Sequence, residues 1–254
     1  FAPVFRRGGF DLQVGNPPWV RLDWRDDLAL AEFDPWWGIA EKTPEGERKR
    51  RRSSNLDKPS WRDGYLSEVA SHEGLTESLS SAQLRPVLTG IRTNLYMVFM
   101  DTVWRHADER GVSGLLHPES HFVDPGAGRL REQTYARLRR HWQFNELGRW
   151  FAEVASPSAV FGAAVYAAPR SPRFLQISNI QAIGQVDGSL AHDGSGPSPG
   201  IALPDGSRDL SPHADRIVTV DESILGDWSR LFDEHGTPAV QARLLRPVTR
   251  QDLE

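Results

Sequence analysis

An asparagine, two prolines and a tryptophan follow a short apolar segment near the start of the chain. Residues 9–19 read GFDLQVGNPPW. Two prolines make a rigid turn, because each fixes φ and lacks a backbone N–H. The Asn16 side chain and the Pro17 carbonyl can therefore present two acceptors side by side, which suits an exocyclic amino group with its two donors. Trp19 adds a flat face on which a planar base can stack. The alternative interpretation is a Pro-Pro loop that carries a buried tryptophan.

The position of these side chains depends on the strand that precedes them. We expect a short strand over residues 10–15 that ends at Asn16, and in open α/β sheets ligands bind beyond the carboxyl ends of the strands. The later expected elements are a helix over 94–109 capped by Thr93, a strand over 112–117 ended by Pro118, a helix over 129–142, and strands over 144–151 and 160–167 paired as a hairpin. This alternation predicts an α/β fold with a mainly parallel sheet and crossover helices.

Two regions lack this regular pattern. Residues 20–90 are predicted to be mostly loop, with short helices over 63–70 and 76–84. Residues 181–254 start as a linker rich in Gly and Pro and continue as a small mixed segment with a strand over 216–220, a helix over 222–233 capped by Asp221, and a short helix over 238–245. We therefore expect a first domain over residues 1–180, with 20–90 as a long insertion, and a boundary near residue 180.

The composition excludes several classes of function. The 254 residues include 30 Lys and Arg against 34 Asp and Glu, so any contact with nucleic acid must depend on local basic patches. There is no cysteine, which excludes disulfides, thiolate catalysis and cysteine-based metal sites. His117, Glu119 and His121 are close in sequence, but His117 ends a strand at Pro118, so we expect no metal site. No segment approaches the roughly 20 apolar residues of a membrane span, and none is typical of a signal peptide. We expect a cytoplasmic protein without a membrane partner.

The strand followed by Asn-Pro-Pro-aromatic resembles the catalytic motif of N6-adenine DNA methyltransferases. The order of the later segments is similar to that of the γ-class enzymes, and the large methylases of restriction–modification or phage-defence systems are the most similar subgroup. These later segments are NLYMVF at 94–99, GVSGLLHPES at 111–120, RLRE at 129–132, FAEV at 151–154 and AVFGAAVY at 159–166. The resemblance covers about residues 8–168.

The chain departs from this family in one respect. In the family, a cofactor-binding half with a Gly-containing loop precedes the catalytic motif, whereas fifteen residues precede Asn16 here. The resemblance therefore implies the catalytic and downstream part of such an enzyme. It implies a partial Rossmann-like sheet with a final antiparallel hairpin, and the upstream half of the same polypeptide as a partner.

The resemblance also implies the chemistry. S-adenosyl-L-methionine would donate the methyl group, and an adenine of double-stranded DNA would flip out of the duplex to accept it. Asn16 and the Pro17 carbonyl would accept the two N6 hydrogens, Pro18 would complete the rigid turn, and Trp19 would stack on the base. Restriction or defence-system subunits would be further partners.

Other candidate site residues lie outside this motif. Phe151 is a candidate for the second face or the edge of the base, with an ordinary core aromatic as the alternative. Tyr96 is a candidate for a cofactor contact, with core packing as the alternative. Arg50, Arg51 and Arg52 belong to a basic run that can contact phosphates, with a solvated loop as the alternative.

Two other functions stay open. The same motif occurs in methyltransferases that act on a protein glutamine and in some RNA enzymes, so the acceptor can be a protein glutamine or an RNA base. A degenerate methylase domain that binds DNA or a partner without catalysis is the other alternative. The segment rich in Trp and Arg after the motif favours DNA.

Overall fold

The structure is a computed structural model that describes residues 1–39, 43–145, 150 and 160–253 of the chain. The chain divides into two compact units. We call residues 1–20 with 90–254 the sheet unit, and residues 21–89 the helical unit. The residues on both sides of position 180 belong to the sheet unit. The boundary expected there concerns the end of the catalytic part, and it stays a prediction.

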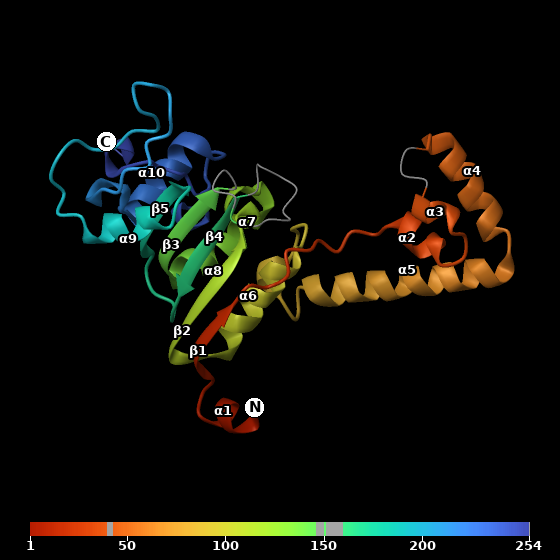
Figure 1. Ribbon diagram of the computed structural model, residues 1–254. Helices are drawn as coiled ribbons and strands as arrows, with labels where there is room; N and C mark the ends of the chain where they lie inside the picture. Colours follow the sequence, from red (N-terminus) through yellow and green to blue (C-terminus); the bar gives the residue numbers. More distant parts are fainter. Residues whose placement is uncertain (40–42, 146–149, 151–159, 254) are drawn as a thin grey trace. The chain divides into compact units, whose positions relative to one another are not determined.

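A mixed sheet forms the centre of the sheet unit. Within the described residues it has six strands in the order β1-β2-β4-β3-β5-β6 (Figure 1). They are β1 (Phe10–Gly15), β2 (Ala107–Pro118), β3 (Leu138–Asn145), β4 (Val160–Tyr166), β5 (Arg173–Ile180) and β6 (Val218–Asp221). The pairs β1–β2 and β3–β5 are parallel, whereas β4 is antiparallel to both of its neighbours and β6 is antiparallel to β5. The predicted α/β class and the antiparallel pairing of consecutive strands near the end of the fold are confirmed.

The helices of the sheet unit, within the described residues, are α1 (Ala2–Arg6), α6 (Leu95–His106), α7 (Ser120–Val123), α8 (Gly128–Arg137), α9 (Gly184–Ala191) and α10 (Glu222–Phe232). Two of them, α6 and α10, begin at a residue whose side chain accepts from free backbone N–H groups. The carboxylate of Asp221 accepts from the N–H groups of Ser223 and Ile224 at the start of α10, which confirms the predicted cap. The cap of α6 is Asn94 instead of Thr93, because the Asn94 side chain accepts from the Tyr96 N–H.

Several of the expected boundaries are wrong, and the short helix expected over 238–245 is only a 3-10 turn over Ala239–Gln241. The helix expected over 129–142 ends at Arg137, and Leu138–Asn145 is a strand, so the strand expected over 144–151 lies several residues too late. This strand is covered on both faces, so apolar residues four apart resemble a helical stripe. In the same way, the helix expected to reach residue 109 ends at His106, and β2 follows at once.

The helical unit contains more helix than the mostly loop region that the sequence predicts, and the short helices expected over 63–70 and 76–84 lie largely within one long helix. It contains α2 (Asp26–Ala31), α3 (Trp36–Ile39), α4 (Glu45–Leu56), α5 (Pro59–Ser80) and the 3-10 turn η1 (Pro86–Leu88). Two aspartates organise it: Asp26 accepts hydrogen bonds from Trp24, Tyr65 and Arg52, and Asp34 accepts from Arg51 and Asn55. Aromatic and charged contacts of this kind leave no regular apolar stripe in the sequence, so the periodicity did not indicate α2, α3 and α4 and indicated only parts of α5.

The two faces of the sheet differ in polarity. One face carries a buried apolar cluster of Phe144, Phe161, Ile177, Ile180 and Val186, which α9 covers through Val186. The alternate residues His117, His141 and Gln176 are buried on the other face. On that face, Tyr96 of α6 stacks on His117 with ring centroids 5.4 Å apart. In the parts of the chain that the structure describes, no helix is long and apolar enough to cross a membrane.

Candidate functional site

The segment Asn16–Trp19 leaves the carboxyl end of β1, as the sequence predicts. Because β1, β2 and β3 point the same way, this end of the sheet also holds Pro118 of β2 and Asn145 of β3. Asn16 and Pro18 are exposed, Pro17 is buried and Trp19 is half-buried. The Asn16 side chain is thus available to a ligand while the turn that carries it is partly anchored.

The indole of Trp19 is held by two neighbouring strands. Its Nε1–H donates to the Leu116 carbonyl at 3.4 Å, at the carboxyl end of β2. Its ring lies 5.6 Å from the Phe161 ring of β4, with 36° between the planes. Trp19 as a whole is half-buried. The contact with Phe161 was not predicted, because it joins residues far apart in the sequence.

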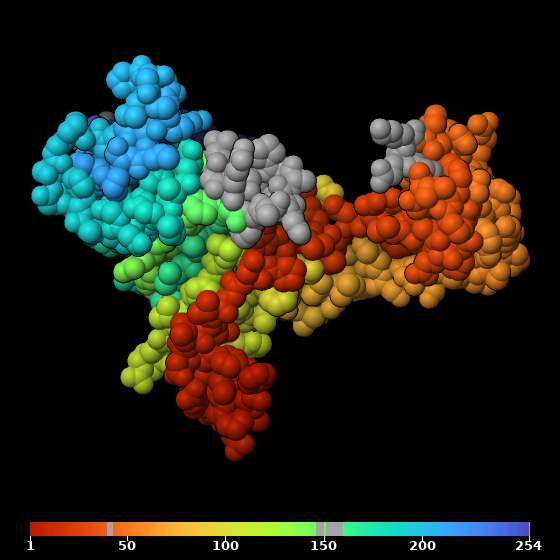
Figure 2. All heavy atoms as spheres, viewed as in Figure 1, coloured from red at the N-terminus to blue at the C-terminus, as the bar shows by residue number. Residues whose placement is uncertain are grey.

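A hollow of about 470 Å³ lies along β1 and ends at the turn. Its lining consists of Phe10, Leu12, Gln13, Val14, Gly15, Asn16, Pro17, Pro18, Phe99, Val103 and Leu115. β1 is the edge strand, and the side chains of Leu12 and Val14 are 65% and 79% exposed. The Gln13 amide donates to the Val103 carbonyl at 2.9 Å and ties the strand to α6. This N-terminal part of the sheet unit lies at the surface (Figure 2).

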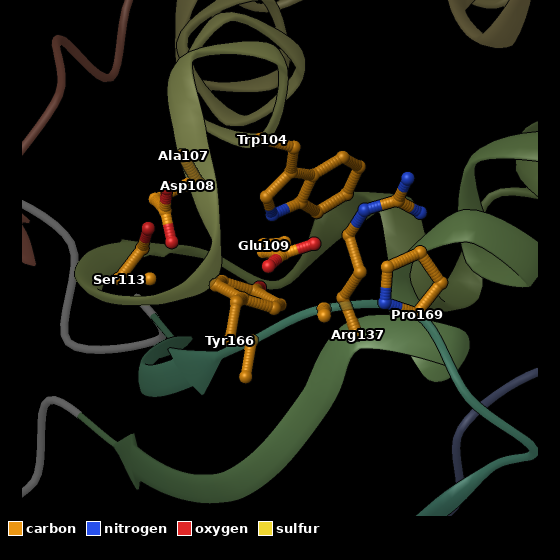
Figure 3. Close-up of a pocket in the computed structure, with 11 residues that line it drawn as sticks. Trp104, Ala107, Asp108, Glu109, Ser113, Arg137, Tyr166 and Pro169 are labelled. Carbon is orange, nitrogen blue, oxygen red and sulfur yellow. The ribbon is translucent and has the colours of Figure 1, made fainter. Parts of the chain in front are cut away.

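A smaller pocket of about 110 Å³ lies at the opposite end of β2. Figure 3 shows Trp104, Arg137 and Tyr166 around it, together with the acidic side chains of Asp108 and Glu109. The Arg137 guanidinium lies 5.1 Å from the centre of the Trp104 ring. This pocket is therefore built at the amino end of β2, away from Asn16.

Buried polar residues surround the carboxyl end of β2, and we call them the polar cluster: Tyr96, His117, Glu119, His121, His141 and Tyr166. His141 Nε2 lies 2.8 Å from Glu119 Oε1, and His117 Nε2 lies 2.7 Å from the Tyr166 hydroxyl. His117 and Glu119 lie at the predicted strand end, but nothing in their spacing indicates a contact with His141. Only the strand order brings these residues together.

Burial shifts the pKa of His117, His121 and Tyr166 in the polar cluster. It lowers the pKa of His117 and lowers that of His121 further, so both imidazoles are neutral at physiological pH. Burial also raises the pKa of the Tyr166 hydroxyl, which stays protonated. No group of three or more His, Cys, Asp or Glu side chains among the residues described is arranged to hold a metal ion.

Tyr96 lies inside this cluster. Its side chain is fully buried, and its hydroxyl is 2.9 Å from Ser120 Oγ and 3.1 Å from His121 Nδ1. The ring is not accessible to a ligand in this state. The structure places Tyr96 in the core, which was the alternative to the cofactor contact.

The three candidate arginines differ in their surroundings. Arg51 binds the Asp34 carboxylate through two nitrogens, at 2.7 and 3.0 Å, and Arg52 pairs with Asp26. The hydrogen bond from Arg51 lowers the pKa of Asp34 to about 2. Arg50 is exposed beside Lys49, and neither has an ion pair within the part of the chain that the structure describes. Arg50 is therefore the arginine best placed for an external anion, and it lies on α4 instead of the expected loop.

Phe151 lies outside the described residues. The segment that carries it leaves β3 at Asn145 and enters β4 at Val160, and both of these residues lie at the same end of the sheet as Asn16. Trp150 beside it donates its Nε1–H to the Asn145 carbonyl at 2.8 Å. The structure therefore brings the two ends of this segment to the candidate site.

No protein-family model and no curated protein sequence matches the chain. The chain does resemble parts of solved structures of restriction–modification proteins. The methyltransferase subunit of a type I system from Streptococcus thermophilus is 13% identical, with a TM-score of 0.31 over 39% of this chain and 22% of that chain. The ATP-dependent type ISP enzyme LlaBIII, solved bound to DNA, is 13% identical, with a TM-score of 0.34 over 65% of this chain and 10% of that chain. A chain of a type I restriction–modification system is 10% identical, with a TM-score of 0.42 over 94% of this chain and 38% of that chain. The chain thus spans less than two fifths of each.

Proposed function

We propose that the chain is the catalytic and downstream part of a site-specific DNA methyltransferase. The acceptor is the N6 amino group of an adenine that has flipped out of double-stranded DNA, and the methyl donor is S-adenosyl-L-methionine. The observation that carries this proposal is the Asn16–Trp19 turn at the carboxyl end of β1, where an exposed amide and a half-buried indole lie beside an open hollow. The setting is the cytoplasm, in a restriction–modification or phage-defence system with its other subunits as partners.

The side chains divide the work at the target base. The Asn16 side-chain oxygen and the Pro17 carbonyl accept the two N6 hydrogens, which increases the electron density on the nitrogen that attacks the methyl group. Pro18 keeps the turn rigid. Trp19, fixed at Leu116 and Phe161, stacks on one face of the base, and Phe151 covers the second face or the edge.

The hollow along β1 fits one side of the methyl donor. Asn16, Pro17 and Pro18 border it, and its remaining lining is mostly apolar and carries no charged side chain among the residues described. When bound, the donor supplies an electrophilic methyl group. Its charged ends need polar partners, and we assign these to the upstream half of the same polypeptide.

The free edge of β1 is the surface for that half. An edge strand presents unpaired backbone N–H and C=O groups, and natural proteins cover or charge such edges. Here Leu12 and Val14 make the edge apolar. A strand from the upstream half pairs with β1 and closes the hollow beside Asn16.

DNA contacts extend to the helical unit. The exposed Arg50 contacts phosphates, together with Lys49. Arg51 and Arg52 act indirectly, because their pairs with Asp34 and Asp26 hold the fold of this unit.

The test is transfer of a labelled methyl group from S-adenosyl-L-methionine by the full-length protein. DNA, RNA and protein are offered separately, and the product nucleosides are identified by mass spectrometry. We expect N6-methyladenine in DNA, its loss in Asn16→Ala, and normal activity in Gln83→Ala, which removes an exposed amide from the helical unit. Label in RNA or in a protein glutamine supports the second function, and sequence-specific DNA binding without label supports a non-catalytic domain.

A further inference from the structure

A buried acid–histidine pair joins the two strands on either side of β4. Glu119 follows β2 and is 4% exposed, and His141 lies in β3 and is fully buried. The carboxylate accepts the Nε2–H of His141 at 2.8 Å. His141 Nδ1 has no hydrogen-bond partner among the described residues, so the ring's one polar attachment there is Glu119. The pair connects β2 with β3 although these strands are not neighbours in the sheet.

The connection passes over a glycine. Gly162 of β4 pairs with His117 on one side and with Gln143 on the other. A Cβ atom at position 162 would lie 2.4 Å from Glu119 Oε1 and 2.9 Å from His141 Nε2, which is closer than atoms can approach without a shift. The absence of a side chain at Gly162 is therefore what lets the carboxylate cross β4.

Two residues that contact the Trp19 indole, Phe161 and Leu116, are next in sequence to residues of the face on which Glu119 passes over Gly162 to reach His141. Phe161, which contacts the indole, precedes Gly162, and Leu116, whose carbonyl accepts the Trp19 Nε1–H, precedes His117. Alternate residues of a strand point to opposite faces, so the polar cluster and Trp19 lie on opposite faces of the same strands. A shift of β4 relative to β2 would therefore move Phe161 and Leu116 apart and displace the indole.

We propose that Glu119 and His141, with Gly162 between them, are positioning residues that set the place of the Trp19 indole for the target base. The identity of that base rests on the proposed function, whereas the effect on Trp19 itself does not. The pair does not touch the substrate and takes no part in proton transfer.

Four variants of the full-length protein separate positioning from general stability. Glu119→Gln keeps an oxygen that accepts the His141 Nε2–H, and Glu119→Leu removes it. Gly162→Ala places a methyl group in the crossing. Gly114→Ala is the matched control, because it also adds a methyl group to a strand glycine but has no atom within 4 Å of the new Cβ.

The first readout is the nitrogen-15 indole spectrum, in which Trp19→Phe identifies the Trp19 signal. We expect this signal to move in Glu119→Leu and in Gly162→Ala and to stay in place in Glu119→Gln and Gly114→Ala. If Glu119→Leu fails to fold, Gly162→Ala takes its place, and His141→Gln, whose amide can still donate to Glu119, is expected to leave the signal in place like Glu119→Gln. An unmoved Trp19 signal in folded Gly162→Ala, or a shift in Glu119→Gln equal to that in Glu119→Leu, overturns the proposal.

The second readout is affinity for duplex DNA with an extrahelical 2-aminopurine, compared with ordinary duplex. In Glu119→Leu and Gly162→Ala, loss of a well-placed stacking face is expected to weaken binding to the duplex with the extrahelical base by about tenfold. Binding to ordinary duplex should change less than about twofold. Equal losses on both DNAs overturn the positioning role. If the unmodified protein shows no preference for the extrahelical base, the proposed function fails, and the indole spectrum still decides whether the pair positions Trp19.

Discussion

Asn16 is suited to its proposed role because an amide oxygen accepts hydrogen bonds without carrying a charge. Its acceptor strength therefore does not depend on pH, unlike that of a carboxylate. We predict that Asn16→Ala lowers the single-turnover rate of methyl transfer by about 10²–10³-fold, which is typical when a hydrogen bond to the transition state is removed. Because Asn16 is exposed, the melting temperature should change little. Near-normal single-turnover transfer in a folded Asn16→Ala protein would show that the assigned role is wrong.

Trp19 combines packing with proposed stacking, and two substitutions separate these contributions. Trp19→Ala should weaken binding to DNA with an extrahelical base by about 1–3 kcal/mol more than binding to ordinary duplex. It should also lower stability, because the indole packs against Phe161. Trp19→Phe keeps a flat ring but loses the hydrogen bond to the Leu116 carbonyl. We expect it to retain most of the preference for the extrahelical base, as measured by fluorescence titration. Equal losses on the two DNAs in Trp19→Ala would leave packing as the sole role of this residue.

Arg51 makes the stability of the helical unit depend on pH. Its hydrogen bond lowers the pKa of Asp34 to about 2 from the ordinary value of 3.8. The stabilisation by ionised Asp34 is therefore fully present above about pH 4 and is lost as the pH falls through about 2. In Arg51→Met the pKa of Asp34 rises, so the acid-induced loss of helix should begin at higher pH, and the melting temperature of the unit should fall at neutral pH. Circular dichroism against pH measures this, and an unchanged acid transition would argue against the pair.

At the scale of elements, α4 presents two kinds of basic residue. Arg51 and Arg52 pair with aspartates inside the unit, whereas Lys49 and Arg50 are exposed. We predict that Lys49→Gln with Arg50→Gln weakens binding equally for all DNA sequences. The slope of log K against log salt should fall by about 0.9 for each phosphate that the protein no longer neutralises. Arg173→Gln, an exposed change at the amino end of β5, is the control. An unchanged salt slope in the double variant would mean that this face of α4 is only solvated.

Elements whose limits depend on local chemistry were predictable from the sequence. β1 ends where two prolines follow, and α10 starts where Asp221 caps it. α4 was missed, and α5 was predicted only as two short helices over 63–70 and 76–84, because the contacts of these helices run through Asp26 and Asp34, which join residues up to 39 positions apart. β3 was displaced because it is buried on both faces.

The candidate site shows the same division between local and distant contacts. The Asn16–Trp19 turn is contiguous in the sequence, so its residue types indicate its chemistry directly. The Glu119–His141 pair depends on the order of three strands and on the small size of Gly162. No spacing in the sequence encodes that contact. The role of Arg51 and Arg52 was equally hidden, because their acidic partners lie 17 and 26 residues away.

At the scale of the whole molecule, the two units have separate interiors, so a change in one should leave the other intact. Arg51→Met should increase hydrogen exchange in α2, α4 and α5 and leave the sheet strands unaffected. The substitution Gly162→Ala should increase hydrogen exchange in the sheet strands and leave α2, α4 and α5 unaffected. Hydrogen exchange followed by mass spectrometry measures both, and parallel changes in the two units would show that they unfold as one.

Cofactor binding should depend on the upstream half of the polypeptide, because that half is proposed to pair with the edge of β1. The hollow beside Asn16 has no charged lining among the described residues, and Leu12 and Val14 are exposed along the edge. We therefore predict that the 254-residue chain alone binds S-adenosyl-L-methionine weakly and tends to aggregate, and that the upstream half corrects both properties. In the full-length protein, Val14→Lys places a charge on the edge and should weaken cofactor binding. Leu28→Lys changes a similarly exposed leucine of the helical unit and should leave cofactor binding unaltered. Calorimetry measures cofactor binding by the 254-residue chain, the full-length protein, Val14→Lys and Leu28→Lys. Micromolar binding by the 254-residue chain, or normal binding by Val14→Lys, would place the cofactor pocket elsewhere.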